Sequence, residues 1–270
     1  EKGNLAVALR LIPTKIRTTE ELGLLKVIDS FTEFPRGLVL VTGPTGSGKS
    51  TTLAAMIDKI NNEKAVHIIT IEDPIEYQHY AKQSIVVQRE VHFDTLSFGA
   101  GLRSALREDP DVVLIGEMRD LETISTAITL AETGHLVMAT LHTNSASQTI
   151  NRVVDVFPAH QQGQIRQVLS FTLQAVVSQQ LIPKSYEVGR ALATEVMIPN
   201  MAVRNLIRED KIHQIYSSMQ SGQEESGMTT MNQSLALLVK QGVLSKQDAI
   251  EHSPVPEELH KLLLTVKERG

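Results

Sequence analysis

A glycine-rich segment with the spacing G-x-x-x-x-G-K-S is the clearest chemical signal in the sequence. It follows the apolar run Leu38–Thr42 and precedes a segment of helical composition, which is the context that a phosphate-binding loop requires. In such a loop, glycines let successive backbone N–H groups point at a phosphate, and the N-terminus of the next helix adds partial positive charge. A glycine-rich turn with a surface lysine is the alternative, which the complete motif in this context disfavours.

The loop predicts that the chain binds ATP together with Mg²⁺. We expect Lys49 to reach the β- and γ-phosphates and the Ser50 hydroxyl to ligate Mg²⁺. The residues expected to contact the nucleotide are Gly43, Pro44, Thr45, Gly46, Ser47, Gly48, Lys49, Ser50 and Thr51.

An acidic segment follows the next apolar run, Val66–Ile71, and contains Glu72, Asp73 and Glu76. In a parallel sheet this segment lies at the same edge as the phosphate loop, so its carboxylates could hold Mg²⁺ or orient water. We therefore expect Glu72 and Glu76 to assist catalysis, and Glu72 and Asp73 to join Ser50 at the metal. A solvated acidic turn is the alternative.

Two further candidate residues follow apolar runs. The run Asp111–Ile115 looks like a Walker B strand, but Gly116 stands where the metal-linked Asp usually stands. Glu117 is then the residue expected to polarise the attacking water. His142 follows the run Leu136–Leu141 and is expected to sense the γ-phosphate or bridge to Glu117, although a lone histidine is often structural.

The arrangement of apolar runs predicts an α/β fold. From Leu38 to about Leu181, short Val-, Ile- and Leu-rich runs alternate with longer segments of helical periodicity, which is typical of a mainly parallel sheet flanked by helices. The predicted strands are Leu38–Thr42, Val66–Ile71, Ser84–Gln88, Asp111–Ile115 and Leu136–Leu141, with one more at Arg190–Met197. We place a boundary near Pro199. The predicted segments after it are helices at Met201–Arg208, Met228–Lys240 and Ser245–Glu251, with a polar loop at Ser221–Gly227.

Composition excludes several classes of protein. The 270 residues carry 31 acidic and 26 basic side chains, a net charge of −5, so no global positive field exists to attract nucleic acid. The absence of cysteine excludes disulfides and thiolate sites. No apolar run approaches the ~20 residues that cross a bilayer. We therefore expect no nucleic-acid partner and no direct membrane span.

Arginines are needed to complete the predicted site. P-loop hydrolases are slow without an arginine supplied in cis or in trans, which is worth ~10³ to 10⁵ in rate. Arg89, Arg103 and Arg107 are the candidates, and the last two lie one helical turn apart, so both could face a partner subunit. An exposed helix face paired with Glu108 or Asp109 is the alternative.

Taken together, these motifs resemble those of the type IV pilus and type II secretion ATPase family, most closely its pilus retraction subgroup. The resemblance covers nearly the whole chain. Besides the phosphate loop it rests on Ile71–Tyr77 as the aspartate box, Gly116–Asp120 with Glu122 and Thr123 as the Walker B element, and Gly134–His135 through His142–Asn144 as the histidine box. Ala202–Glu209 is similar to the subgroup's A-I-R-N-L-I-R-E element, with Val203 in place of Ile.

The resemblance implies a RecA-like ATPase that works as a homohexamer, with ATP between neighbouring subunits and hydrolysis driving domain rotations that depolymerise a pilin fibre. It also implies a cytoplasmic protein that docks on an inner-membrane pilus platform protein. Residues 1–36 would be the remnant of a PAS-like N-terminal domain, with its last strand around Leu5–Ile12, plus a linker. Residues 37–199 would form the RecA-like ATPase domain and 200–270 a helical C-terminal region.

Other functions remain open at this point. A pilus-assembly or type II secretion ATPase of the same family would share these motifs. A P-loop kinase would pass the γ-phosphate to a small acceptor, but the sequence has no lid-like insertion rich in arginine. A non-hydrolysing, nucleotide-gated scaffold would bind ATP without turnover.

Overall fold

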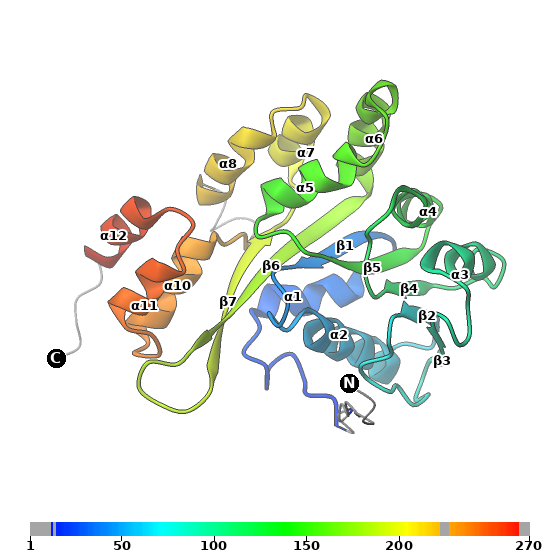
Figure 1. Cartoon of the computed structure of the whole chain (residues 1–270), viewed down its shortest axis with the longest axis horizontal. Helices are drawn as coiled ribbons and strands as arrows, with labels where there is room; N and C mark the ends of the chain where they lie inside the picture. The colour runs from blue at the N-terminus through cyan, green and yellow to red at the C-terminus, as the bar shows by residue number, and fades with distance from the viewer. Residues whose placement is uncertain (1–11, 13–14, 222–226, 265–270) are drawn as a thin grey trace, which may run out of the picture.

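A computed structural model describes residue 12 and residues 15–221 and 227–264. Its centre is a seven-stranded sheet in the order β3-β2-β4-β5-β1-β6-β7 (Figure 1). The strands are β1 (Gly37–Thr42), β2 (His67–Glu72), β3 (Ile85–Glu90), β4 (Val112–Ile115), β5 (Leu136–Leu141), β6 (Leu173–Pro183) and β7 (Arg190–Met197). Every neighbouring pair is parallel except β6 and β7, which are antiparallel. The predicted α/β fold with a mainly parallel sheet is confirmed.

Strand β6 is the element that the apolar pattern did not reveal. Its sequence is interrupted by polar residues, yet Ser178 and Gln179 are both buried. Ser178 Oγ lies 2.8 Å from Thr42 Oγ1, and Gln179 Nε2 donates to Thr52 Oγ1 at 2.8 Å. Ser178 thus pairs with Thr42 and the Gln179 amide nitrogen with Thr52, beside the phosphate loop, so their polarity does not mark an exposed segment.

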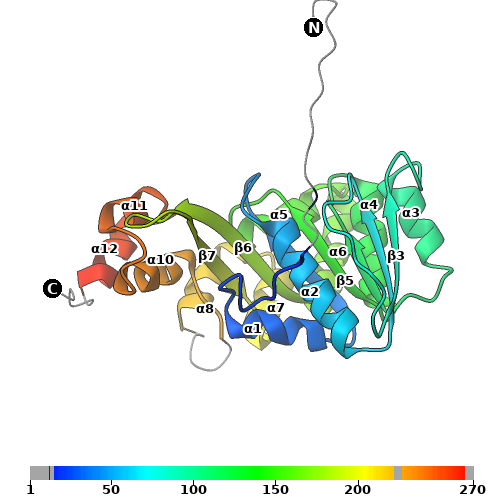
Figure 2. The same ribbon diagram turned by 90° about the horizontal axis from the view of Figure 1, so that it is seen from below.

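Helices cover both faces of the sheet because each central strand is apolar on both sides. On β1, Leu38 and Leu40 belong to one core cluster, whereas Val39 and Val41 belong to the other. The second face carries α1 (Lys26–Ser30) and α2 (Lys49–Glu63), while α3 to α7 lie on the first (Figures 1 and 2). Those on the first face are α3 (Phe98–Ala105), α4 (Leu121–Glu132), α5 (Ala146–Asp155), α6 (Ala159–Thr172) and α7 (Met201–Arg208).

The helices after Pro199 divide between two clusters. Residues of α7, of the 3₁₀ turn η2 (Ile212–Gln214) and of α8 (Ile215–Ser221) pack into the large sheet cluster. In contrast, α10 (Met231–Lys240), α11 (Lys246–Glu251) and α12 (Pro256–Leu264) pack around the far end of the β6–β7 hairpin. The boundary predicted near Pro199 is therefore not a division of the hydrophobic core.

Two predicted segments differ from the structure or fall outside it. The helix expected from Met228 begins only at Met231, because Thr229 pairs with Val196 and Thr230 caps the helix through a capping box with Gln233. The strand expected around Leu5–Ile12 lies, except for Ile12, outside the described residues, as do residues 222–226 of the expected polar loop.

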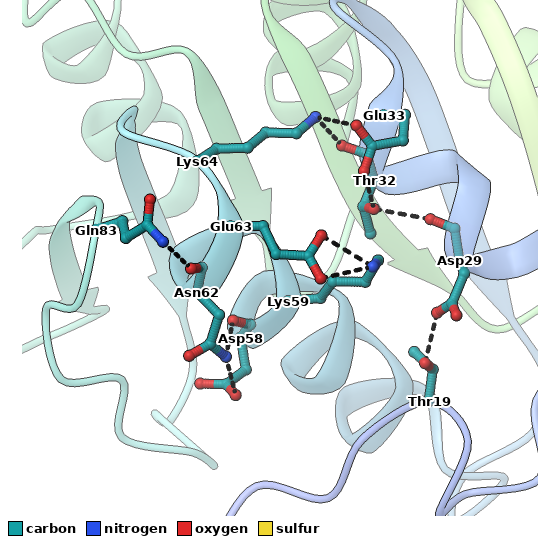
Figure 3. Close-up of polar contacts among 10 residues, drawn as sticks. All are labelled: Thr19, Asp29, Thr32, Glu33, Asp58, Lys59, Asn62, Glu63, Lys64 and Gln83. Atoms are coloured by element: carbon teal, nitrogen blue, oxygen red, sulfur yellow. Dashed lines mark hydrogen bonds and ion pairs between the residues drawn. The ribbon is translucent and has the colours of Figure 1, made fainter.

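The segment before β1 is fastened to the sheet and to the end of α2. Ile28 and Phe31 are fully buried in the α1 and α2 face. Beyond the end of α2, Lys64 Nζ donates to Thr32 O at 2.6 Å and pairs with Glu33 at 3.1 Å (Figure 3). Residues that the resemblance assigns to a domain remnant and linker thus contribute to the core.

Among the described residues, no helix combines the length and the apolar character that a membrane crossing requires.

Candidate active site

The phosphate loop joins β1 to α2 and has the conformation of an anion cradle. Gly43, Gly46 and Gly48 have φ values of 142°, 80° and 90°, a region that side-chain-bearing residues rarely adopt. Helix α2 begins at Lys49 after Gly48, which brings no side chain to cap it. The N–H groups of its first turn are therefore available to a phosphate, and the helix dipole favours negative charge there.

Lys49 bends back over the loop. Its Nζ donates to Gly43 O at 2.9 Å and to Pro44 O at 3.0 Å, and it lies 3.5 Å from His142 Nδ1. The residue is 8% exposed. Burial lowers the pKa of Lys49, while the charges of Glu117 and Glu76 oppose that shift. The ammonium group is thus held by carbonyl oxygens that phosphate oxygens can replace.

Glu117 and His142 lie beside Lys49 and form a continuous polar contact with it. His142 Nε2 is 3.2 Å from Glu117 Oε1, and Arg119 Nε is 2.5 Å from the same oxygen. Burial by itself raises the pKa of Glu117, but Arg119 and His142 outweigh it and hold the pKa below its usual value. Glu117 is therefore a carboxylate at neutral pH, and His142 joins it to the lysine of the phosphate loop.

The acidic turn lines the other side of the site. Glu72 is the last residue of β2 rather than the first residue after it, and its Oε1 accepts hydrogen bonds from Thr70 Oγ1 at 2.6 Å and Gln88 Nε2 at 3.2 Å. Burial raises the pKa of Glu72. Asp73 and Glu76 follow and line the same cavity as Ser50.

These oxygen donors fit a magnesium ion that arrives with the nucleotide. Ser50, Glu72 and Asp73 supply hard oxygen ligands around one cavity. Across the described ranges, no group of three or more His, Asp or Glu side chains could hold a metal by itself. Ser50, Glu72 and Asp73 are a donor set of the kind expected for Mg²⁺, because Mg²⁺ takes most of its ligands from phosphates and water.

A cavity of about 750 Å³ contains the phosphate loop, the acidic turn, Glu117 and His142. It has the size of a typical ligand site. Tyr77, Arg119, Thr140 and Arg190 are among the lining residues that were not predicted as site residues. In the sequence, Tyr77 directly follows the predicted Glu76, and Arg119 lies two residues after Glu117. Tyr77 Oη lies 2.8 Å from Thr51 Oγ1. Arg190 has no local signal, because the β6–β7 hairpin brings it there.

The candidate arginines are not brought to this cavity. Arg103 and Arg107 are exposed on or just after α3 and are not among the cavity's lining residues, and Arg103 pairs with Glu122. Arg89 Nη2 donates to both carboxylate oxygens of Glu108, at 2.9 and 2.8 Å. Pairing with Glu108 was the alternative to a catalytic role for this arginine.

The segment Ala202–Glu209 lies on α7, with Glu209 as the residue that caps its C-terminus, and the apolar side of the helix is packed. Val203 and Ile207 are fully buried. The Arg204 guanidinium donates to Ser170 O at 2.6 Å and Phe171 O at 3.1 Å, at the end of α6. Burial lowers the pKa of Arg204. This residue therefore anchors α7 to α6.

Replacing Gly43 tests the conformation of the phosphate loop. A Cβ at this position would lie 2.4 Å from Gln179 O and 2.6 Å from Ser47 Oγ. We expect Gly43→Ala to lose nucleotide binding and about 2–5 kcal/mol of stability, from overpacking added to backbone strain. The matched control is Gly242→Ala, since Gly242 also has a positive φ, 71°, lies outside the cavity and has no described atom within 4 Å of its Cβ position. It should cost only the ~1–2 kcal/mol of a positive φ. Thermal denaturation and ADP titration of both variants measure the difference, and equal behaviour would contradict the prediction.

Comparison with known proteins gives a consistent result. Residues 6–188 match the family described as type II/IV secretion system protein. The type IV pilus retraction ATPase PilT of Pseudomonas aeruginosa is 58% identical over 92% of this chain and 72% of its own length. The twitching motility protein of Neisseria gonorrhoeae is 56% identical over 90% of this chain and 65% of its own length. The chain thus spans about two thirds to three quarters of these relatives.

Solved structures agree with this assignment. The crystal structure of the pilus retraction motor PilT with bound ADP superposes with a TM-score of 0.88, at 57% identity, over 93% of this chain and 71% of that one. The ATPase DotB of Legionella pneumophila superposes with a TM-score of 0.81, at 29% identity, over 89% of this chain and 66% of its own. The predicted RecA-like secretion ATPase core is confirmed, and the chain belongs to the type II/IV secretion system protein family.

Proposed function

We propose that this chain is the ATP-hydrolysing core of a hexameric motor that drives type IV pilus retraction, the process underlying twitching motility. The observation that carries the proposal is the contact running from Lys49 in the phosphate loop through His142 to Glu117. It places a carboxylate held ionised next to the group that binds the terminal phosphates. The names of the relatives that match over nine tenths of the chain support pilus retraction as the work performed.

The chemistry follows from the positions of these residues. Backbone N–H groups of the loop and Lys49 bind the β- and γ-phosphates. Glu117 orients a water molecule and accepts its proton, while the water oxygen bonds to the γ-phosphorus. The bond from that phosphorus to the bridging oxygen breaks, and the oxygen stays on ADP. Ser50, Glu72 and Asp73 would hold Mg²⁺, which would supply positive charge to the phosphates.

His142 can report the state of the nucleotide. Its two ring nitrogens face Lys49 and Glu117. When Lys49 exchanges its carbonyl partners for phosphate oxygens, the contact on Nδ1 changes, and the segment carrying His142 responds. Glu76 assists the site through its charge on Lys49.

We further propose that Arg103 and Arg107 act in trans. Their exposure and their absence from the cavity of their own chain support a role at a neighbouring copy. A homohexamer would place them at the next subunit's nucleotide and would raise the rate that Glu117 alone supports. The ring would work at the cytoplasmic face of the inner membrane on a pilus platform protein.

Retraction is preferred over type II secretion on one specific comparison. Type II secretion system protein E of Klebsiella pneumoniae is 47% identical, but over only 59% of this chain. The type IV pilus retraction ATPase PilT and the twitching motility protein match over 90% or more of the chain, and these matches therefore include residues after Pro199.

The test combines a biochemical and a cellular measurement. Light scattering should show six subunits with an ATP analogue, and the assembled chain should release phosphate into water. Phosphate appearing on an added metabolite would indicate a kinase, and tight ATP binding without turnover would indicate a scaffold.

In the source organism, Glu117→Gln should abolish twitching and leave surface pili abundant. Cells without pili would indicate an assembly ATPase, and a secretion defect in piliated, motile cells would indicate a secretion ATPase.

A further inference from the structure

Glu195 on β7 is a buried carboxylate outside the cavity. It is 2% exposed. Its Oε1 accepts a hydrogen bond from the backbone N–H of Ala146, the first residue of α5, at 2.8 Å. The backbone N–H of Met231, the first residue of α10, lies near the same carboxylate and lowers its pKa. One side chain therefore bonds the N-terminus of α5 and lies beside the N-terminus of α10, and these two helices are far apart in the sequence.

Such a placement needs a physical reason, because burying a carboxylate is costly. Burial raises the pKa of Glu195, while the amides of Ala146 and Met231 oppose that shift. Each helix N-terminus contributes an N–H donor and a partial positive charge, so the two together compensate for lost hydration. Moving either helix away would leave the carboxylate poorly satisfied, which makes the two helix ends move together.

The first of these helices positions His142. Ala146 follows His142 by four residues, and the intervening segment is tied to α5. Thr143 Oγ1 lies 2.7 Å from Thr149 Oγ1, and Asn144 N donates to Gln148 Oε1 at 3.1 Å. A displacement of the first turn of α5 is therefore a displacement of the segment that faces Lys49 and Glu117.

The second helix leads into the C-terminal cluster. Thr229, just before α10, pairs with Val196 on β7 in both directions, at 2.8 and 2.9 Å. Asn232 Nδ2 then donates to Glu258 on α12 at 3.0 Å, and Tyr216 on α8 donates to the same carboxylate. Polar contacts thus continue from the start of α10 to α8 and α12.

We propose that Glu195 is a positioning residue that couples the segment carrying His142 to helix α10, so that changes at the γ-phosphate reach the C-terminal helices. The proposal deepens the proposed function and rests on it, because the input is the nucleotide at that site. Glu195 touches neither nucleotide nor water. It acts by holding α5 where His142 meets Glu117, and by making α10 follow.

Two variants remove the coupling from opposite sides. Glu195→Gln keeps the shape but removes the negative charge that faces both helix N-termini, and its amide NH₂ replaces one acceptor oxygen by a donor. Ala146→Pro removes the N–H that meets Glu195 at a helix position where proline is well tolerated, and the extended Ser145 before it suits a proline. For both variants we expect KM for ATP within about 2-fold of the parent and kcat lowered about 10-fold, because a small displacement of reacting groups slows the chemical step.

The matched control is Ser234→Ala. It removes the Thr194 N to Ser234 Oγ hydrogen bond of 3.0 Å, which also joins β7 to α10 but does not involve α5. We expect this variant to melt at a lower temperature with kcat unchanged. Unchanged kcat in a folded Glu195→Gln or Ala146→Pro variant would overturn the proposal, as would an equal loss of kcat in Ser234→Ala. If one of the two variants does not fold, the other decides.

Amide hydrogen exchange gives a readout that does not depend on turnover. In the parent chain, adding ADP should change protection in the first turns of α5 and α10 together. In Glu195→Gln the change at α5 should persist and the change at α10 should disappear. A persistent response of α10 would overturn the coupling. Failure of the proposed function is distinguished because the parent itself would then show no ATP turnover.

Discussion

Glu117→Gln is expected to bind ATP as tightly as the parent chain and to turn it over about 10³-fold more slowly, the loss typical of a missing general base. The amide keeps the size of the side chain and can still meet Arg119 and His142, so the fold and the phosphate loop should be unaffected. Steady-state phosphate release gives kcat and KM, and titration with ADP gives the affinity. The effect should appear in kcat alone, because the carboxylate acts on water rather than on the bound phosphates.

A second acid on the same face of the sheet provides the control for this result. Glu132 ends α4 and is exposed. Glu132→Gln removes the same charge from the chain, and we expect parental kcat and KM. Turnover of Glu117→Gln within about 2-fold of the parent, in the same oligomeric state, would show that another group accepts the proton.

Lys49→Met should weaken nucleotide binding by about 10² to 10³-fold, because charge-assisted hydrogen bonds to phosphate are worth ~1.5–3 kcal/mol each. Methionine preserves the length and much of the packing of the buried stem while removing the ammonium group. Calorimetric titration with ADP and with a non-hydrolysable ATP analogue measures the loss. We expect it to be larger for the triphosphate, which offers the γ-phosphate as well.

Lys59→Met is the matched control for the lysine experiment. Lys59 lies on the same helix, α2, and pairs with Glu63 at 2.8 Å on the surface (Figure 3). An exposed i,i+4 pair contributes only ~0.3–0.5 kcal/mol, so this variant should bind nucleotide like the parent. ADP affinity of Lys49→Met within about 3-fold of the parent would contradict the role assigned to the lysine, provided that thermal melts show both variants folded.

Local features were predictable from the sequence. The phosphate loop needs only a strand, a turn built from glycines and a helix that begins at the lysine, all within one contiguous stretch. Strands β1, β2, β3, β4 and β5 were found within two residues of their predicted ends. Buried parallel strands are continuous apolar runs, and the partly exposed edge strand β3 still begins with the apolar residues 85–87. The polar strand β6 was missed, because its buried Ser178 and Gln179 form hydrogen bonds with partners distant in the sequence.

Which residues meet was decided by the order of the strands. Lys49, Glu117 and His142 follow β1, β4 and β5, and these three strands lie side by side in the sheet. Their carboxyl ends therefore open onto one edge, which brings the three side chains into contact. Periodicity along the chain carries no information about strand order, so the sequence alone could only nominate these residues.

The sequence by itself determined what chemistry this chain can perform, since loop, acids and histidine are chemical types at local spacings. Only the tertiary structure decided how that chemistry is connected to the rest of the molecule. It turned Arg89 toward Glu108, left Arg103 and Arg107 away from their own cavity, and set Glu195 between two helix ends. The physical reason is that a buried charge acquires its partners from long-range packing, and no pattern of neighbouring residues specifies that packing.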